Sequence, residues 1–194
     1  LRDIVMPVPR GKMLGGSSGS NYMAYVRGHP GDFDIWAEMG AAGWGFDEVL
    51  PYFRKSEDLT PSNEIAVDGE AHGTGGPLGV SVRSPVIPAS RDFVSAAEAT
   101  GMQRGDYNGC SRGGPEGVTS LFQTTTRNGM RSSTYRAFLQ GSAEERDNLT
   151  IITGAHVTRV LLEGEGDALR ATGIEYRDEN GALQQVSAAQ DVVL

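Results

Sequence analysis

The sequence predicts a mixed fold of helices and strands, α/β in content with an α+β order of elements. Three observations predict it: a glycine-rich turn near the start, helical patterns with long loops in the middle, and short strand-like runs toward the end. With 194 residues, of which 38% are hydrophobic, the chain is long enough for one or two domains with a core.

The glycine-rich turn contains Gly15 and Gly16 and precedes the pattern of a short buried helix, which begins near Ser17 or Ser18 and runs to Arg27. Such a turn brings backbone N–H groups to an anionic cofactor. The alternative is a tight turn in which paired glycines let a helix pack closely on a sheet. The spacing matches neither the phosphate loop of nucleoside triphosphatases nor the G-x-G-x-x-G fingerprint, so it leaves the ligand open.

Four helical patterns follow. In chain order we expect helices over 33–39, from 47 through 53, over 89–100, and from Ser132 or Ser133 through 139. Asp32 and Asp47 are the expected N-caps of the first two, because a carboxylate there accepts a backbone N–H. Gly40 and Gly101 are the expected ends of the first and third helices, since glycine adopts the left-handed conformation that closes a helix. Core packing is expected for the aromatic residues Trp36, Trp44, Tyr52 and Phe53.

Strand-like patterns occupy the rest of the chain. Between 60 and 85 the sequence is rich in Gly and Pro, and the alternation of Leu78, Val80 and Val82 predicts one short strand inside a long loop. The β-branched run over 117–127 predicts another strand. In the C-terminal part we expect strands over 149–152, 156–162, 171–177, 183–186 and 191–194. Asn180-Gly181 predicts a hairpin turn, because both residues accept positive φ.

Composition and charge argue against several classes of function. The net charge of −8, with 17 Lys and Arg spread along the chain, argues against a nucleic-acid partner, because phosphate binding needs a concentrated basic surface. The single cysteine, Cys110, excludes an intrachain disulfide framework and a cysteine-based zinc site, and no set of metal ligands supports metal binding. No run approaches the roughly 18 to 20 apolar residues that span a bilayer. The chain does not begin with Met and stops within a strand-like run, so we expect a piece of a longer protein.

Several spaced motifs carry a resemblance to a known family. The run from Pro9 to Gly28 reads P-R-G-K-x-L-G-G-S-S-x-x-N-x-M-x-Y-x-R-G, and D-x-D-x-W at 32–36, G-W at 43–44 and V-L-P-Y-F at 49–53 follow it. Further matches are H-G-T-G-G-P-L at 72–78, R-x-S at 131–133 and N-L-T at 148–150. Together they resemble the glucose-methanol-choline (GMC) flavin oxidoreductases over essentially the whole chain. Within that family the sequence is most similar to choline-dehydrogenase-like and related alcohol dehydrogenase members.

The resemblance implies FAD as the cofactor. The cofactor-binding residues it implies are Gly15, Gly16, Ser17, Asn21, Tyr22, Met23, Ala24 and Val157. The first three would approach the cofactor with their backbone, the next four would contact the flavin, and the main chain of Val157 would contact the adenine. Some members hold FAD covalently through a His at the position of Ser20, so the resemblance implies noncovalent FAD here.

The resemblance also implies a division into three segments, in which part of the substrate-binding domain is inserted into the FAD-binding domain. Residues 1–35 would belong to the FAD-binding domain, and residues 36–147 would be a middle region contributing to the substrate-binding domain and covering the cofactor. Residues 148–194 would return to the FAD-binding domain as its β-rich part.

The implied function is that of a fragment of an FAD-dependent oxidoreductase, which transfers hydride from the CH–OH carbon of an alcohol to flavin N5. The family's catalytic His would lie downstream and its dinucleotide fingerprint upstream, so no catalytic residue is assigned to this chain and the isolated fragment is expected to be inactive. The alternatives are a GMC-fold lyase that keeps FAD as a structural element, and a non-enzymatic truncated remnant.

The expected partners are a small-molecule alcohol and an electron acceptor that the sequence does not identify, either oxygen, a quinone or another carrier. We expect a cytoplasmic protein, with membrane association as the alternative if the acceptor is a quinone. The chain contains three histidines, His29, His72 and His156, and no motif makes any of them the family base. Structural or solvated histidines are therefore the expectation.

Overall fold

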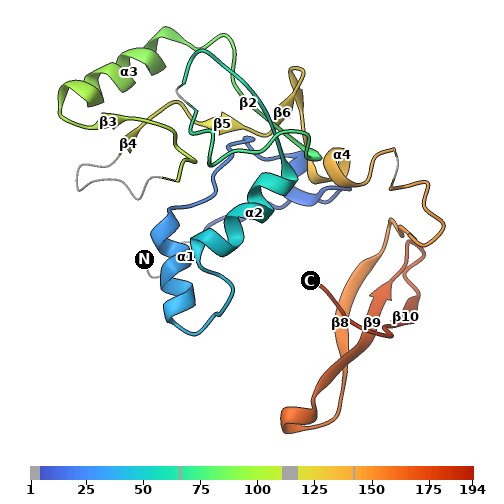
Figure 1. Ribbon diagram of the computed structural model, residues 1–194. Helices are drawn as coiled ribbons and strands as arrows, with labels where there is room; N and C mark the ends of the chain where they lie inside the picture. The colour runs from blue at the N-terminus through green and yellow to red at the C-terminus, as the bar shows by residue number, and fades with distance from the viewer. Residues whose placement is uncertain (1–4, 66, 111–117, 142) are drawn as a thin grey trace. The chain divides into compact units, whose positions relative to one another are not determined.

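The computed structural model describes residues 5–65, 67–110, 118–141 and 143–194. The chain forms two compact units, Leu1–Ala143 and Glu144–Leu194. Helices and short strands are interspersed in the first unit, whereas the second contains a small antiparallel sheet (Figure 1). The predicted mixed α/β and α+β fold is therefore confirmed. The functional roles predicted for residues 1–35, 36–147 and 148–194 stay predictions.

The four predicted helices are present. They are α1 Pro30–Glu38, α2 Phe46–Ser56, α3 Pro88–Ala99 and α4 Thr134–Phe138. Gly40 and Gly101 follow α1 and α3 with left-handed φ values of 105° and 102°, as predicted. Ser133 caps α4, and its hydroxyl accepts a hydrogen bond from the backbone N–H of Arg136. In the part of the chain that the structure describes, no helix is long and apolar enough to cross a membrane.

The predicted N-caps Asp32 and Asp47 are wrong, because both helices begin earlier. Helix α1 begins at Pro30, and its N-cap is His29, whose ring Nδ1 accepts a hydrogen bond from the first turn. Pro30 suits the first helical position, where a missing N–H costs no hydrogen bond. Asp32 instead accepts a hydrogen bond from the backbone N–H of His29. The N-cap of α2 is Gly45, and Asp47 lies in its first turn.

A three-stranded sheet runs through the first unit. Strand β2, Leu78–Val82, lies where the alternation predicted it. It pairs in parallel with β1, Glu57–Thr60, and antiparallel with β5, Gln123–Thr124. The sequence did not predict β1, because Glu-Asp-Leu-Thr contains one apolar residue and follows α2 directly.

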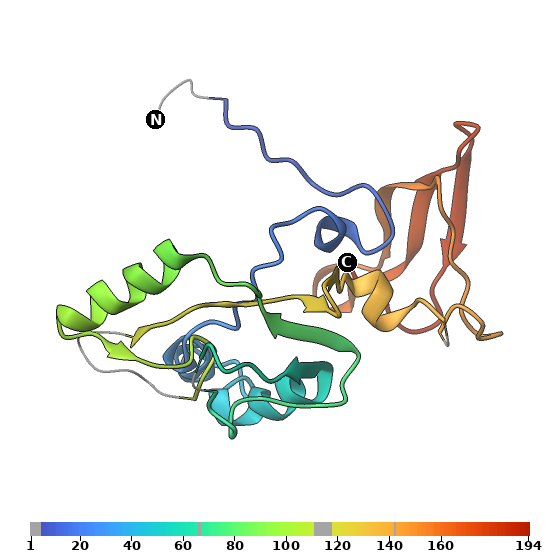
Figure 2. The ribbon, with the colours of Figure 1, turned by 90° about the horizontal axis from the view of Figure 1, so that it is seen from above.

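The single strand predicted over 117–127 is wrong. The described part of that run contains three two-residue strands, β4 Val118–Thr119, β5, and β6 Thr126–Arg127. Each has a different partner: β4 pairs with β3 Gln103–Arg104, β5 with β2, and β6 with β7 Met130–Arg131. Composition predicts strand content here but not the changes of partner that interrupt the run. Figures 1 and 2 show α3 beside β3 and β4.

The core of the first unit is divided into small groups. Two apolar clusters contain Tyr25, Leu59 and Val80, and Ile65, Val82 and Val86. An aromatic group on α1 and α2 is built around Phe33, whose ring centre lies 5.3 Å from that of Trp36 and 5.6 Å from that of Phe53. Trp44 packs against Trp36 at 6.0 Å. Tyr52 is 71% exposed, Trp44 53% and Trp36 47%, so the core packing predicted for these three residues is wrong within this chain, whereas Phe53 is half-buried.

The second unit contains an antiparallel sheet of order β10-β9-β8. Its strands are β8 His156–Glu163, β9 Arg170–Arg177 and β10 Leu183–Ser187, and each matches a predicted strand. The Asn180-Gly181 turn joins β9 to β10, which confirms the predicted hairpin, but only Gly181 has a positive φ, 81°, so the positive φ expected at Asn180 is wrong. The runs 149–152 and 191–194 are fully described and pair with no strand, so the strands predicted there are wrong.

Candidate functional site

The glycine-rich turn forms a single 3₁₀ turn, η1, over Gly16–Gly19. Gly15 precedes it with φ of 84° and Gly16 opens it with φ of 53°, left-handed conformations that glycine adopts without a steric penalty. The backbone N–H groups of the two residues after η1 both bond to the carbonyl of Ser17. The helical conformation ends there.

The helix predicted to continue from this turn to Arg27 is wrong. Met23 has a left-handed φ of 64°, which an α-helix does not accommodate. The chain around it pairs with residues 123–125, and Tyr25 N donates to the carbonyl of Gln123 at 2.9 Å. Pairing with a segment about a hundred residues away therefore replaces the local helical hydrogen bonds.

The loss of this helix changes the physical basis of the predicted anion site. A helix dipole does not supply the attraction, which must instead come from individual N–H groups of the turn. Among the described residues, the backbone N–H groups of Gly15 and Ser17 have no hydrogen-bond acceptor. These two groups are donors available to a ligand.

The two glycines of the turn have different surroundings. A Cβ at Gly15 would lie 3.0 Å from the backbone nitrogen of Tyr135 in α4, so this glycine permits close packing. A Cβ at Gly16 would meet no atom within 4 Å, so the space beside its Cα is open to a bound group, whereas its carbonyl lies against Gly11. Close packing therefore occurs at Gly15, but against α4 and not between a helix and a sheet as the alternative had it, and anion binding at Gly16 stays a prediction. Free N–H donors beside an open glycine backbone fit an anionic group such as a cofactor diphosphate.

The other predicted contact residues lie in two places. Residues 21–24 follow η1 without helical structure, and Ala24 forms an isolated β-bridge with Thr124. Tyr22 is 97% exposed within this chain. Val157 lies on β8, in the second unit. Contact between these residues and FAD stays a prediction.

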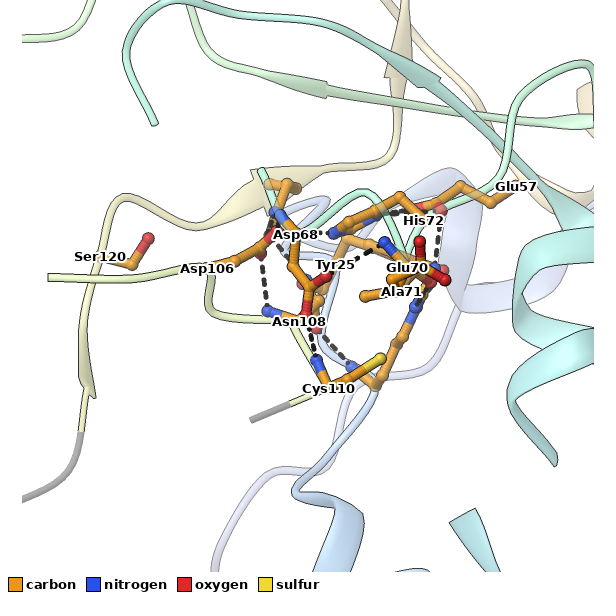
Figure 3. A network of polar contacts seen from close by, with 12 residues as sticks. Tyr25, Glu57, Asp68, Glu70, Ala71, His72, Asp106, Asn108, Cys110 and Ser120 are labelled. Atoms are coloured by element: carbon orange, nitrogen blue, oxygen red, sulfur yellow. Dashed lines mark hydrogen bonds and ion pairs between the residues drawn. The ribbon is translucent and has the colours of Figure 1, made fainter. Parts of the chain in front are cut away.

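Four charged side chains form a buried ionic network in the first unit (Figure 3). Arg27 Nη2 lies 2.6 Å from Glu57 Oε2. His72 bridges two carboxylates, with Nδ1 at 2.9 Å from Glu57 Oε1 and Nε2 at 2.9 Å from Asp106 Oδ2. None of the four side chains is more than 4% exposed. His72 is therefore a buried structural residue, one of the two roles expected for it.

Two buried amides join this network to the segment that follows the turn. Asn108 Oδ1 accepts a hydrogen bond from Arg27 N at 2.9 Å, and its Nδ2 donates to Tyr25 O at 2.9 Å. Asn108 Nδ2 also donates to Gln123 Oε1, and Gln123 Nε2 donates to Asp106 Oδ1 at 2.8 Å. No buried side-chain N or O atom in the described part of the chain lacks a partner. The network therefore has a structural role and fixes the backbone of residues 25–27.

Sequence reasoning did not find this network. Arg27 and His72 belong to the motifs that carry the family resemblance, but no spacing connects them with Glu57 or Asp106. Only the folded chain brings these residues into contact. Across the described ranges, no group of His, Cys, Asp and Glu has the arrangement of a metal site.

The network shifts the pKa of two of its members in opposite directions. Burial alone would lower the pKa of His72, but hydrogen bonds to Asp106 and Glu57 raise it to about 9. Burial alone would raise the pKa of Asp106, but the hydrogen bonds from His72, Asp68 N and Gln123 lower it to about 2. At neutral pH two cations therefore face two carboxylates, which offsets the cost of removing each charge from water.

Between pH 6.5 and about 9, we expect the free energy of unfolding to fall by up to about 3 kcal/mol. The folded protein keeps the His72 proton until about pH 9, whereas the unfolded chain releases it near 6.5. The stabilisation is therefore complete below pH 6.5 and is lost as pH rises through 9. Urea unfolding from about pH 5 to about pH 10 measures this change.

The variant His72→Gln isolates the effect from other groups that titrate in this range. The difference in unfolding free energy between wild type and His72→Gln should shrink as pH rises. His156→Gln, at the exposed start of β8, is the matched control and should keep the wild-type profile. If the difference in unfolding free energy between wild type and His72→Gln stayed constant over this pH range, the pH dependence could not be assigned to His72.

The fold and the turn together define a class: a protein of mixed α/β structure with a glycine turn that fits the anionic part of a nucleotide cofactor. A family model described as GMC oxidoreductase matches residues 3–194. The chain belongs to the GMC oxidoreductase family, as its motifs predicted.

Individual relatives agree with this assignment. The chain is 40% identical over 188 residues to an oxygen-dependent choline dehydrogenase of Vibrio vulnificus, a match that covers 95% of this chain and 31% of the relative. It is 40% identical over 173 residues to an alcohol dehydrogenase [acceptor] of Pseudomonas putida, covering 89% and 29%. An FAD-dependent oxidoreductase from Chaetomium thermophilum matches with a TM-score of 0.78 at 28% identity, over 94% of this chain and 32% of that chain. The chain thus spans about a third of the length of these proteins.

Proposed function

We propose that this chain is a segment of an FAD-dependent oxidoreductase that acts on the CH–OH group of an alcohol. Membership in the GMC family and similarity to choline and alcohol dehydrogenases support the reaction class. The observation that carries the cofactor proposal is the turn at 15–17, with its free N–H donors beside the open backbone of Gly16. When bound, FAD would supply the flavin N5 that accepts hydride from the alcohol carbon.

In this proposal the chain's own residues bind and orient the cofactor. The backbone N–H groups of Gly15 and Ser17 donate to the diphosphate, which lies close to the backbone of Gly16, and residues 21–24 lie along the flavin. Val157 binds the adenine through its main chain, since β8 is an edge strand with one free side in the second unit. Ser20 has no ring nitrogen to form a covalent link, which supports noncovalent FAD.

The histidines of this chain are not proposed as the catalytic base. His29 caps α1, and both ring nitrogens of His72 contact buried carboxylates. We propose that the base and the dinucleotide fingerprint belong to other parts of the protein, and that these 194 residues alone do not oxidise alcohols. The acceptor proposed is oxygen, a quinone or another carrier.

Anaerobic addition of an alcohol is expected to bleach the flavin absorption of the complete FAD-bound protein, because hydride transfer reduces the flavin. Choline and simple primary alcohols are the substrates to test first. Acid precipitation is expected to release the FAD into the supernatant, as noncovalent binding requires. The measurements are flavin absorbance before and after alcohol addition, and FAD content of the pellet and supernatant.

Three outcomes would contradict parts of the proposal. A complete protein that purifies without FAD and does not bind added FAD would contradict the proposal that FAD is the cofactor. FAD that stays in the acid pellet would contradict noncovalent binding. Bound FAD that no primary or secondary alcohol bleaches would contradict alcohol oxidation and favour a GMC-fold lyase that keeps FAD as a structural element.

A further inference from the structure

Residues 131 and 134 donate hydrogen bonds to Gly15, Ser18 and Asn21, in and next to the glycine-rich turn, and Figures 1 and 2 show α4 beside this part of the chain. Arg131 Nη1 donates to the carbonyl of Ser18 at 3.0 Å and to Asn21 Oδ1 at 2.8 Å. Thr134 donates its backbone N–H to Ser18 Oγ at 2.9 Å and its hydroxyl to the carbonyl of Gly15 at 3.2 Å. A segment more than a hundred residues away in sequence therefore determines the geometry of the turn.

These contacts fix which way the Asn21 amide faces. Its Oδ1 accepts from Arg131 and from the backbone N–H of Met23, at 3.0 Å. Both partners are donors, so a flipped amide would place its NH2 group against two N–H groups. The oxygen must therefore face Arg131, and the NH2 group must face away from it. Within the described residues this NH2 group has no acceptor, which leaves it available to a ligand.

The charge of Arg131 is directed at the turn. Arg27, Arg91, Arg127 and Arg159 each contact a carboxylate. By contrast, the described partners of Arg131 are two neutral oxygens, Ser18 O and Asn21 Oδ1. A guanidinium bound to an amide oxygen polarises that amide, which strengthens its NH2 group as a hydrogen-bond donor.

We propose that Arg131 is a positioning residue for the bound flavin: by holding Asn21 Oδ1 it directs the polarised Asn21 NH2 group toward the flavin ring. This inference rests on the proposed function, because it needs FAD at this turn. The directed Asn21 donor, strengthened by the Arg131 charge, favours the electron-rich reduced flavin. Arg131 therefore sets the affinity for FAD and also its reduction potential, without contacting the reacting atoms.

The test compares FAD affinity, flavin spectrum and reduction potential in the complete protein carrying Arg131→Met, Arg131→Lys or no substitution. Arg131→Met is expected to raise the FAD dissociation constant at least about tenfold, make the flavin potential more negative and shift the flavin absorption bands. Arg131→Lys should recover part of each change, because an ammonium can donate to one of the two oxygens. Arg136→Met is the matched control, since Arg136 lies five residues along and contacts Met130 and the Arg131 carbonyl but not the turn.

A double-mutant cycle tests whether Arg131 acts through Asn21. If it does, Asn21→Ala and the double variant Asn21→Ala/Arg131→Met should have the same flavin potential. Additive shifts would overturn the proposal, as would wild-type affinity and spectrum in Arg131→Met. A fall in the melting temperature of the FAD-free Arg131→Met protein that exceeds that of Arg136→Met, with unchanged potential, would show a purely structural role and would also overturn it. If the wild type binds no FAD, it is the proposed function that fails.

Discussion

Replacing Glu57 with glutamine is expected to destabilise the protein by about 3 to 5 kcal/mol. The Glu57 carboxylate accepts hydrogen bonds from Arg27 Nη2 at 2.6 Å, His72 Nδ1 at 2.9 Å and the backbone N–H of Gly73 at 2.8 Å. Glutamine keeps the shape but has one acceptor oxygen and no charge, so Arg27 and His72 stay buried without their shared anion. An uncompensated buried charge costs several kcal/mol, which is a large part of the stability of a typical domain.

Urea unfolding of the wild-type and Glu57→Gln proteins at neutral pH measures this loss. The control is Glu64→Gln, which makes the same chemical change in an ion pair with Arg91 that is 32% and 47% exposed. Solvent screens that pair, so Glu64→Gln should lower the free energy of unfolding far less than Glu57→Gln does. Equal losses in the two variants would contradict the central role assigned to the buried network.

The second large effect is expected at Gly16, where alanine should raise the FAD dissociation constant at least about tenfold. A Cβ there would project into the open space beside the turn, where the proposed diphosphate contacts the backbone. A methyl group at that point would hold the anion away from the N–H donors of Gly15 and Ser17. Fluorescence titration of the FAD-free complete protein with FAD measures the change.

The chain contains a closely matched control for this substitution. Gly166 also opens a 3₁₀ turn, has φ of 54° against 53° at Gly16, and has no atom within 4 Å of its missing Cβ. Alanine at either position carries the same backbone penalty, on the order of 1 kcal/mol. Gly166→Ala should therefore lower stability as much as Gly16→Ala while FAD affinity is unchanged. Equal FAD affinity in both variants would contradict binding at Gly16.

Local signals in the sequence predicted much of the fold. Gly40 and Gly101 ended their helices as expected, Ser133 capped α4, and alternation located β2. The Asn180-Gly181 hairpin formed for the same reason, since each of these features depends on residues a few positions apart. Caps were predicted less well than helices, because a proline at position 30 moved the start of α1.

In the candidate site, too, the sequence determined the local features and the tertiary structure determined the contacts between distant segments. The paired glycines, the motif spacing and the resulting family were determined by the sequence, because turn conformation and motif identity are local properties of the chain. Only the tertiary structure decided that Met23 leaves the helical conformation, that Arg131 holds Asn21, and that Glu57 lies between two cations. Those features depend on pairing between segments up to about a hundred residues apart. Their energy comes from burial and charge contacts that exist only once the chain has folded.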